Sequence, residues 1–506
     1  MTGHTTWLRA ERQEGMAHEA GRPALEVNGS RSQSLHGTAA GTLATGAESK
    51  AALRDGRQEG GCVKSGSRQS VSEAPAVPKA AIQGVEASDR DWSWVEASIW
   101  NERMLAALAN GVKGGKWFSL IDKVYRLATL QAAWRKVAAN AGAAGVDGQS
   151  VERFAGGAEA YLDELKQALE SGAYQPQPVK RVEIPKGAGK TRPLGIPAVK
   201  DRIVQTAVKL VMEPIFEREF RDTSYGFRPG RGCKDALREV DRWLKSGYTH
   251  VVDADLKSYF DTIPHARLMA RVGERVSDGR LLQLIEAFLQ QDIVQGLQRW
   301  TPTGGTPQGA VMSPLLANIY LHDLDCRMQA RGYRMVRYAD DFVVLTCSAS
   351  EAQAALGIVQ AWVEENELSL NAEKTHVGDC RIRGQGFDFL GYRFEAGQRW
   401  VRRKSLHALR DRIRSQTKRT RGESIRCIIA DLNPMLKGWF GYFKHAHLMD
   451  LRGVDGFIRR RLRALLRKQQ KRPGLGRCRA DQVRWPNAFF AELGLFTMAE
   501  AHALAS

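Results

Sequence analysis

The sequence contains little cysteine and no long hydrophobic segment. Its 506 residues include seven cysteines, and no two of them form a Cys-x-x-Cys pair. This distribution argues against a disulfide framework and against a zinc module, and it favours a reducing compartment. No run of about 18 apolar residues is present, and the N-terminus lacks the apolar core of a signal peptide. We therefore expect a protein that neither spans a membrane nor is secreted.

The chain is also short of acidic residues. Lysine and arginine number 75 against 56 aspartates and glutamates, which gives a formal net charge of +19. The excess is concentrated in residues 401–484, which hold 24 Lys and Arg against six Asp and Glu. Apolar residues recur there at helical spacing, so we predict a small helical bundle with a basic outer face. Charge of one sign on such a face indicates a nucleic-acid partner.

Large apolar residues are scarce in the first 95 residues, which are rich in Gly, Ala, Ser, Arg and Glu. Such a segment cannot bury enough apolar surface to offset the entropy lost on ordering, so we predict a disordered leader at residues 1–95. A basic tail that tethers RNA is the alternative, and composition leaves it open. The remaining chain is long enough for two to four domains.

An Asp-Asp pair within Arg337 to Leu345 is the most informative feature. Apolar, β-prone residues flank Asp340 and Asp341 on both sides, which predicts a tight β-hairpin with two carboxylates at its tip. Aspartate is common in turns for ordinary reasons, so the pair alone is a weak signal. Adjacent carboxylates repel, however, and Mg²⁺ neutralises them well. A two-metal site needs a further carboxylate from elsewhere in the chain.

A strand-like run upstream supplies that carboxylate. Residues 251–261 are Val-Val-Asp-Ala-Asp-Leu-Lys-Ser-Tyr-Phe-Asp. With Tyr-Ala-Asp-Asp at 338–341, this run resembles the palm of the group II intron-encoded reverse transcriptases, or maturases. The resemblance extends over about residues 117–496 and includes Ser-Tyr-Gly-Phe-Arg-Pro-Gly-Arg-Gly at 224–232 and Thr-Pro-Gln-Gly at 306–309. It implies an α/β, right-hand polymerase fold, with fingers, a palm built on an antiparallel sheet, and a helical thumb also called domain X.

The resemblance also implies a domain order and a reaction. Fingers with an N-terminal extension are expected at residues 100–245, a catalytic palm at 246–398, and a basic thumb with a C-terminal tail at 399–506. The reaction implied is RNA-directed DNA synthesis with two Mg²⁺ ions. The ions are expected on three aspartates and one backbone carbonyl, namely Asp255, Asp340, Asp341 and Leu256. Asp255 is preferred to Asp253 because only Asp255 fits the register of the family motif.

Nucleotide contacts are predicted from the fingers and from the palm motif. A basic hairpin at residues 179–197 is expected to close over the incoming triphosphate, with Lys190 and Arg192 at its phosphates. A solvated basic turn is the alternative. Phe260 is expected to crowd a ribose 2′-hydroxyl and so to select deoxynucleotides. A plain core phenylalanine is the alternative there.

Three further nucleotide contacts come from the loops beside the palm. Gln308 and Gly309 are predicted next to the nascent base pair, where small residues let the backbone approach. Lys374 is predicted near the triphosphate as a proton donor to the leaving group, and a surface lysine is the alternative. Contacts with template, primer or intron RNA are predicted for basic residues of the fingers and thumb. These are Arg228, Arg231, Arg402, Arg403, Lys404, Lys437, Arg459, Arg460 and Arg461.

The function implied is that of a group II intron reverse transcriptase that also acts as a maturase, binding intron RNA and assisting splicing and retrohoming. A domesticated reverse transcriptase without an intron, and an RNA-binding splicing factor without polymerase activity, are the alternatives. Relatives often carry a C-terminal His/Cys nuclease domain, and no metal-ligand spacing for one is found here. Expected partners are intron RNA, an RNA/DNA template-primer and dNTPs, with no membrane. A cytoplasmic, nucleoid-associated ribonucleoprotein is expected, and a homodimer is left open.

Overall fold

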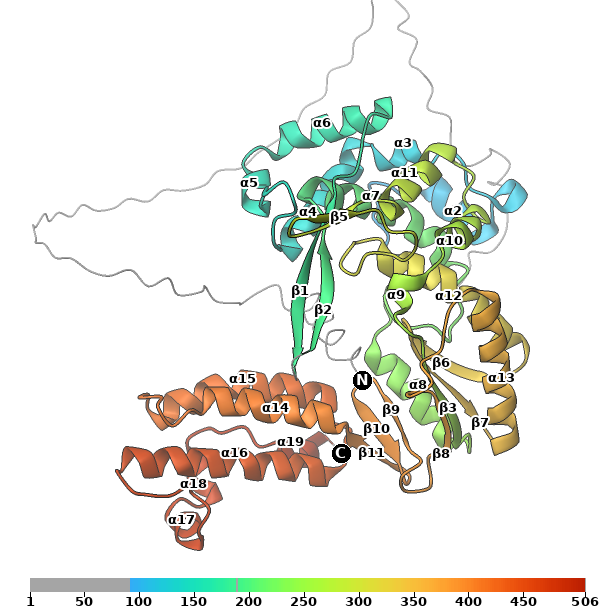
Figure 1. Ribbon diagram of the computed structural model, residues 1–506. Coiled ribbons are helices and arrows are strands. Elements are labelled where there is room, and N and C mark those ends of the chain that lie inside the picture. Colours follow the sequence, from blue (N-terminus) through green and yellow to red (C-terminus); the bar gives the residue numbers. More distant parts are fainter. Residues whose placement is uncertain (1–91, 188–189, 506) are drawn as a thin grey trace, which may run out of the picture. The chain divides into compact units, whose positions relative to one another are not determined.

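The computed structural model describes residues 92–187 and 190–505, which Figure 1 colours along the sequence. Nearly all of the leader predicted at residues 1–95 lies outside this part, as does the tip of the basic hairpin at 188–189. In the described part, no helix combines the length and the apolar character needed to cross a membrane.

The first half of the described chain is mainly helical and carries one long hairpin. Helix α7 (Val199–Glu217) is its centre, since most of its side chains are buried, and α4 (Leu127–Asn140) packs along it. Strands β1 (Val179–Gly187) and β2 (Lys190–Ile196) form the predicted basic hairpin in a sheet of order β2-β1-β4-β5. The other elements of this half are α2 (Glu102–Asn110), α3 (Ile121–Val124), α5 (Val151–Ala155), α6 (Ala158–Ser171), β4 (Ile293–Gln295) and β5 (Gln298–Trp300).

A four-stranded antiparallel sheet forms the centre of the fold. Its order is β6-β7-β3-β8, with β3 (His250–Asp255), β6 (Arg334–Tyr338), β7 (Asp341–Thr346) and β8 (His376–Asp379). These strands are rich in Val, Phe and Tyr, which favour a pleated and buried surface. Alternate residues enter two different cores, Val252 and Phe342 on one face and Val251 and Val343 on the other.

Helices cover both faces of this sheet. Helices α12 (Ser313–Ala330) and α13 (Ala349–Glu365) contribute to the core of the Val252 face, and α8 (Cys233–Lys245) contributes to the core of the Val251 face. Three further helices, α9 (Tyr259–Thr262), α10 (His265–Gly273) and α11 (Gly279–Leu289), follow β3 in the chain. The face that carries Val251 also carries Asp253 and Asp255, because residues two apart in a strand share a face.

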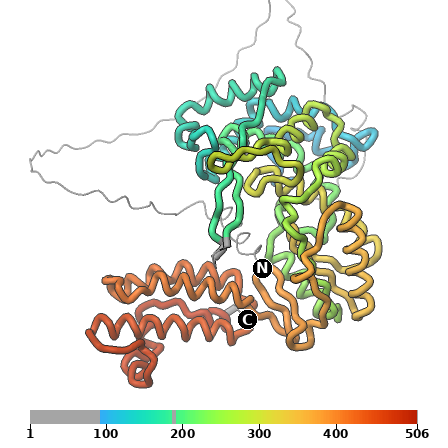
Figure 2. The backbone as a smooth tube through the Cα atoms, in the orientation of Figure 1, coloured from blue at the N-terminus to red at the C-terminus, as the bar shows by residue number. Residues whose placement is uncertain are grey.

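The C-terminal part is a small sheet followed by helices. Strands β9 (Phe387–Phe389), β10 (Tyr392–Glu395) and β11 (Gln398–Val401) pair in the order β11-β10-β9 and lead directly into α14 (Figure 2). The predicted basic bundle is confirmed, with Leu409, Leu432 and Leu462 in one core. Its helices are α14 (Arg403–Gln416), α15 (Ile425–Phe443), α16 (Leu448–Gln469), α17 (Arg479–Arg484), α18 (Asn487–Glu492) and α19 (Met498–Ala505).

Candidate active site and nucleic-acid interface

Two neighbouring strands bring the predicted carboxylates together. Antiparallel pairing of β3 with β7 places Asp255 directly opposite Asp341. Because Tyr338 pairs with Asp341, only Ala339 and Asp340 form the turn between β6 and β7. Ala339 has a φ of 59°, in the left-handed region that a residue with a side chain adopts at a cost. The predicted hairpin is confirmed, and its strained turn carries Asp340.

The segment after α13 adds a cation to these carboxylates. The backbone N–H of Asn371 donates to the carbonyl of Asp255 at 2.8 Å, which fixes this segment along the end of β3. Lys374 Nζ then lies 2.7 Å from Asp255 Oδ2. Lys374 therefore contacts the carboxylate cluster while remaining partly exposed, and its predicted role at the triphosphate stays a prediction.

The carboxylates in this cluster disfavour one another's ionisation. Burial raises the pKa of Asp340 to about 6, and the charge of Asp255 adds to the rise. The pKa of Asp341 lies well above its ordinary value, first because the group is buried and then because Asp253, Asp340 and Asp255 are close. Burial also raises the pKa of Asp253 to about 7. A cluster of this kind is stabilised in its ionised form by a cation.

The donor chemistry of the cluster fits a hard divalent cation. Asp255, Asp340 and Asp341 offer carboxylate oxygens, which Mg²⁺ prefers, and the Lys374 ammonium already meets one of them. Among residues 92–187 and 190–505, no group of three or more His, Cys, Asp or Glu side chains is placed so that it could hold a metal ion by itself. Mg²⁺ takes one or two carboxylates and completes its shell with water and substrate phosphates.

A buried arginine supports the Asp340 turn from the other side of the sheet. Arg337 donates from Nε and Nη2 to the two oxygens of Asp325 at 2.8 and 2.5 Å, and neither side chain has any exposed surface. Its Nη1 donates to Asn318 Oδ1 and to the carbonyl of Ala339, both at 2.9 Å. Asp325 and Asn318 belong to α12, so that helix holds the turn. Sequence reasoning missed this network, because nothing in the spacing along α12 shows which polar residues face inward.

The loop at residues 224–232 packs against the same turn. The backbone N–H of Tyr225 donates to the carbonyl of Arg337 at 2.9 Å. The side-chain amide of Asn318 donates to the carbonyl of Gly226 at 2.8 Å. A Cβ at Gly226 would lie 2.4 Å from the backbone nitrogen of Ala339. Glycine is therefore required at 226, because any side chain would displace the turn.

Arg228 in this loop is a packing residue, and its predicted contact with nucleic acid is wrong. Its guanidinium lies 2.6 Å from Glu217 and donates to the carbonyl of Ser224, and its side chain is 1% exposed. A charge buried this deeply needs such partners and cannot reach a phosphate. Arg231, by contrast, remains partly exposed, pairs with Asp222 and lies over the ring of Tyr225.

The Thr-Pro-Gln-Gly loop packs against the base of β2. The backbone N–H of Gly195 donates to the carbonyl of Gln308 at 2.6 Å, and a Cβ at Gly309 would lie 2.3 Å from the Gly195 oxygen. Gly309 also has a φ of 110°. Contact with β2 and this backbone conformation already require glycine at 309, and the predicted approach of a base pair stays a prediction.

The remaining nucleotide-site predictions have clear positions. Arg192 lies in β2 opposite Ile184, whereas the side chain of Lys190 lies outside the described residues. Phe260 is 6% exposed and belongs to the same core as Val252, which agrees with its core alternative. Leu256 follows β3 directly and forms an isolated bridge with Leu370. The roles proposed for Arg192, Phe260 and the Leu256 carbonyl stay predictions.

Two family models match this chain in sequence. Residues 184–394 match the family described as "Reverse transcriptase (RNA-dependent DNA polymerase)", and residues 406–485 match "Group II intron, maturase-specific domain". The chain is 38% identical over 292 residues to protein YkfC of Escherichia coli (strain K12). The matched region covers 49% of this chain and 75% of YkfC. It belongs to the group II intron-encoded reverse transcriptase and maturase family.

Further matches to this reverse transcriptase cover smaller shares of the matched proteins. The group II intron-encoded protein LtrA of Lactococcus lactis subsp. cremoris is 42% identical over 171 residues, which span 34% of this chain and 28% of LtrA. A partial Cas6-RT-Cas1–Cas2 complex superposes with a TM-score of 0.31 at 25% identity, covering 49% of this chain and 41% of that chain. A reverse transcriptase domain typically requires a divalent metal ion, in agreement with the carboxylate cluster.

Two basic residues, Arg461 and Arg402, also make contacts within the protein, and their predicted contacts with RNA stay predictions. Arg461 donates to the hydroxyl and the carbonyl of Thr417 at 3.0 and 2.5 Å, at the C-terminal end of α14. Unsatisfied carbonyls at a helix end favour such a cationic donor. Arg402 lies 2.8 Å from Asp388 and is 19% exposed, so it joins β9 to the start of α14.

Other basic residues of the maturase region face solvent. Arg403, Lys437 and Arg460 are exposed, while Lys404 and Arg459 are half-buried. The ring of Phe457 has three guanidinium groups near it. Their central carbons lie 5.2–6.0 Å from the ring centroid and belong to Arg410, Arg414 and Arg460. The sequence analysis missed Arg410 and Arg414, although their spacing of four along a helix predicts one shared face.

Substituting Gly226 tests the support of the Asp340 turn. Gly226→Ala is expected to reduce primer extension at least about tenfold and to cost about 1–3 kcal/mol of stability, because its Cβ would overlap Ala339. Gly273→Ala in α10 is the matched control, since its Cβ would meet nothing within 4 Å. The control should be neutral or slightly stabilising. Primer-extension rates and urea unfolding measure both effects, and equal behaviour of the two variants would contradict the prediction.

Proposed function

We propose that this reverse transcriptase copies an RNA template into DNA from dNTPs, with two Mg²⁺ ions held by Asp255, Asp340, Asp341 and the Leu256 carbonyl. The pairing of Asp255 with Asp341, with Asp340 in the adjoining turn, is the observation that carries the proposal. When bound, the metal ions would stabilise charge on the attacking and leaving oxygens of an in-line phosphoryl transfer. The proposed division is fingers at residues 100–245, palm at 246–398 and thumb at 399–506.

The chain's own residues orient the reactants and move a proton. Lys374 lies 2.7 Å from Asp255 beside the proposed metal ligands, which supports the proposal that its ammonium donates a proton to the pyrophosphate leaving group. Arg192 on β2 is proposed to neutralise the triphosphate. The buried pair of Arg337 and Asp325 keeps the Asp340 turn fixed, and fixed groups lower the cost of aligning primer and nucleotide.

A separate binding function is proposed for the basic bundle. Its match to the maturase-specific domain, together with the exposed cations Arg403, Lys437 and Arg460, supports binding of group II intron RNA. Binding of this kind would assist splicing and retrohoming within a cytoplasmic, nucleoid-associated ribonucleoprotein. A reverse transcriptase without an intron, or a splicing factor with an inactive palm, would be distinguished by measuring primer extension and splicing separately.

Primer extension with dNTPs and with rNTPs tests the polymerase and the role of Phe260 together. We expect the wild-type protein to extend a primer on RNA in Mg²⁺ and to prefer dNTPs by at least about 100-fold, which corresponds to about 2.7 kcal/mol. Phe260→Val should lower this preference at least about tenfold, because the smaller side chain crowds a 2′-hydroxyl less. Phe288→Val removes the same volume from a buried position on α11 and should leave the preference unchanged. An unchanged preference in Phe260→Val would leave Phe260 as a core residue only.

The raised pKa values predict that ionised carboxylates lower the stability of the metal-free protein, whereas the same ionised groups favour Mg²⁺ binding. The folded-state pKa of Asp340 is about 6 against an ordinary value of 3.8, so folding binds a proton and stability falls as pH rises through this window. Without Mg²⁺, Asp340→Asn should therefore raise the Tm at pH 7.5 and have little effect near pH 4. Mg²⁺ should raise the Tm of the wild type and much less that of the variant. Calorimetry with and without Mg²⁺ measures both, and an equal Mg²⁺ shift in the two proteins would contradict the ligand assignment.

A further inference from the structure

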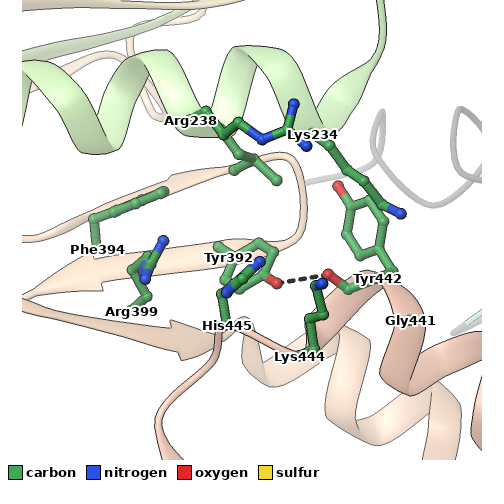
Figure 3. A pocket seen from close by; sticks show the side chains of 10 residues that line it. Lys234, Arg238, Tyr392, Phe394, Arg399, Gly441, Tyr442, Lys444 and His445 are labelled. Carbon is green, nitrogen blue, oxygen red and sulfur yellow. Dashed lines mark hydrogen bonds between the residues drawn. The ribbon is translucent and has the colours of Figure 1, made fainter. Parts of the chain in front are cut away.

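A small pocket lined by cations lies apart from the carboxylate cluster. Its volume is about 120 Å³, and its walls come from α8, the β10–β11 hairpin and the chain around the end of α15 (Figure 3). Five of its lining residues carry basic side chains, Lys234, Arg238, Arg399, Lys444 and His445. None of them is among the residues proposed above for metal, nucleotide or RNA.

Few carboxylates balance this charge. Arg238 pairs with Asp235, while Arg399 and Lys245 share the single carboxylate of Asp241 at 3.5 and 2.8 Å. Within the described part of the chain, Lys234 and Lys444 have no carboxylate within 4 Å. Lys234, Arg238 and His445 are exposed and Lys444 is half-buried, so the mouth of the pocket presents uncompensated positive charge to solvent.

The imidazole of His445 lies among the same charged side chains. Burial lowers the pKa of its imidazole, and the charges of Arg399 and Lys444 lower it further. Asp241 acts in the opposite direction but less strongly, and Arg238 adds to the lowering. Burial and these cations thus act in the same direction on the imidazole, and an anion bound among the cations would act in the opposite direction.

The polar groups of the aromatic wall are already committed to the protein. The Tyr392 hydroxyl donates to the carbonyl of Tyr442, and the Tyr442 hydroxyl donates to the carbonyl of Leu390, each at 2.7 Å. Figure 3 shows the first of these bonds across the pocket. A ligand would thus be held by the ammonium, guanidinium and imidazole groups, whose charge selects an anion. The two hydroxyl bonds tie β10 to α15 and keep the walls in place.

We propose that this pocket binds one phosphate of the RNA on which the protein acts, and that the bound phosphate holds α8, β11 and the end of α15 together. Its volume suits a phosphate group better than a whole nucleotide. A larger pocket of about 630 Å³ shares Phe394, Arg399 and His445 with it, which leaves room for the neighbouring nucleotides. The inference rests on the proposed RNA-binding function and adds a specific contact to it. Free phosphate offers the same chemistry from another source.

Removing two unpaired charges tests the contact. In the full-length protein, Lys234→Gln with Lys444→Gln should weaken RNA binding about tenfold at 0.1 M salt. It should also reduce the slope of log K against log salt by about 0.7, the contribution of one phosphate contact to a single strand. Lys113→Gln with Lys116→Gln is the matched control, because both lysines are exposed and the charge change is identical. Equal losses in the two double variants would overturn the site, since charge alone would then explain them.

The pKa of the His445 imidazole can distinguish an RNA phosphate from free phosphate as the bound anion. Its pKa, followed by NMR, should rise by at least about one unit when RNA binds, and the rise should be absent in the Lys234→Gln, Lys444→Gln protein. A rise with inorganic phosphate but not with RNA would overturn the RNA assignment and leave a free-phosphate site. No rise with either would overturn the pocket as an anion site. Salt-sensitive RNA binding by the same wild-type preparation separates these outcomes from failure of the proposed RNA-binding function.

Discussion

Replacing Asp340 and Asp341 together by alanine is expected to abolish primer extension, with a loss of at least about 10³-fold, while the protein remains folded. The loss follows because both carboxylates, with Asp255 opposite Asp341, are the proposed holders of the metal ions. Folding should survive because burial and mutual repulsion disfavour these groups in the ionised state. Removing them takes away an unfavourable contribution to the free energy of folding.

The same variant separates the two proposed functions. RNA affinity and splicing assistance should be retained, since they are assigned to the basic bundle and not to the carboxylates. Asp163→Ala is a suitable control, because this aspartate is exposed on α6 and should leave primer extension unchanged. Primer extension, RNA binding and circular dichroism would be measured on each protein. Retained extension in the Asp340, Asp341 variant would reject the active-site assignment, and lost splicing with RNA binding intact would count against the independent maturase function.

Replacing Arg337 by methionine is expected to destabilise the protein by about 3–5 kcal/mol, the largest effect on stability that we predict. The substitution leaves the Asp325 carboxylate fully buried with its main partner removed, and an uncompensated buried charge is costly. It also removes the donors to Asn318 and to the carbonyl of Ala339. Urea unfolding measures the change.

A double-mutant cycle separates the charge from the support of the turn. Arg337→Met combined with Asp325→Leu should recover most of the lost stability, because neither charge then remains buried. Primer extension should stay low in the double variant, since the Ala339 carbonyl still lacks its donor. Arg267→Met serves as a surface control, because its pair with Glu367 is 46% and 59% exposed and should contribute less than about 1 kcal/mol. Full activity in the refolded double variant would show that Arg337 contributes only to stability.

The sequence by itself determined the kind of chemistry and the location of the basic surface. Alternating apolar residues around Asp340 and Asp341 specify a hairpin, because β-pairing follows local side-chain periodicity. The apolar spacing between residues 401 and 484 likewise specifies helices with a charged outer face. Both patterns are local, so they can be recognised without knowing what packs against them.

Only the tertiary structure decided which polar residues face inward and which reach a ligand. Arg228 and Arg231 lie three residues apart in one motif, yet Arg228 is buried and pairs with Glu217 of α7, while Arg231 remains partly exposed. Arg337 meets Asp325 and Asn318 only when α12 packs on β6. The basic pocket likewise forms from three segments far apart in the chain. The pairing of buried charges depends on long-range packing, which the local spacing of residues does not encode.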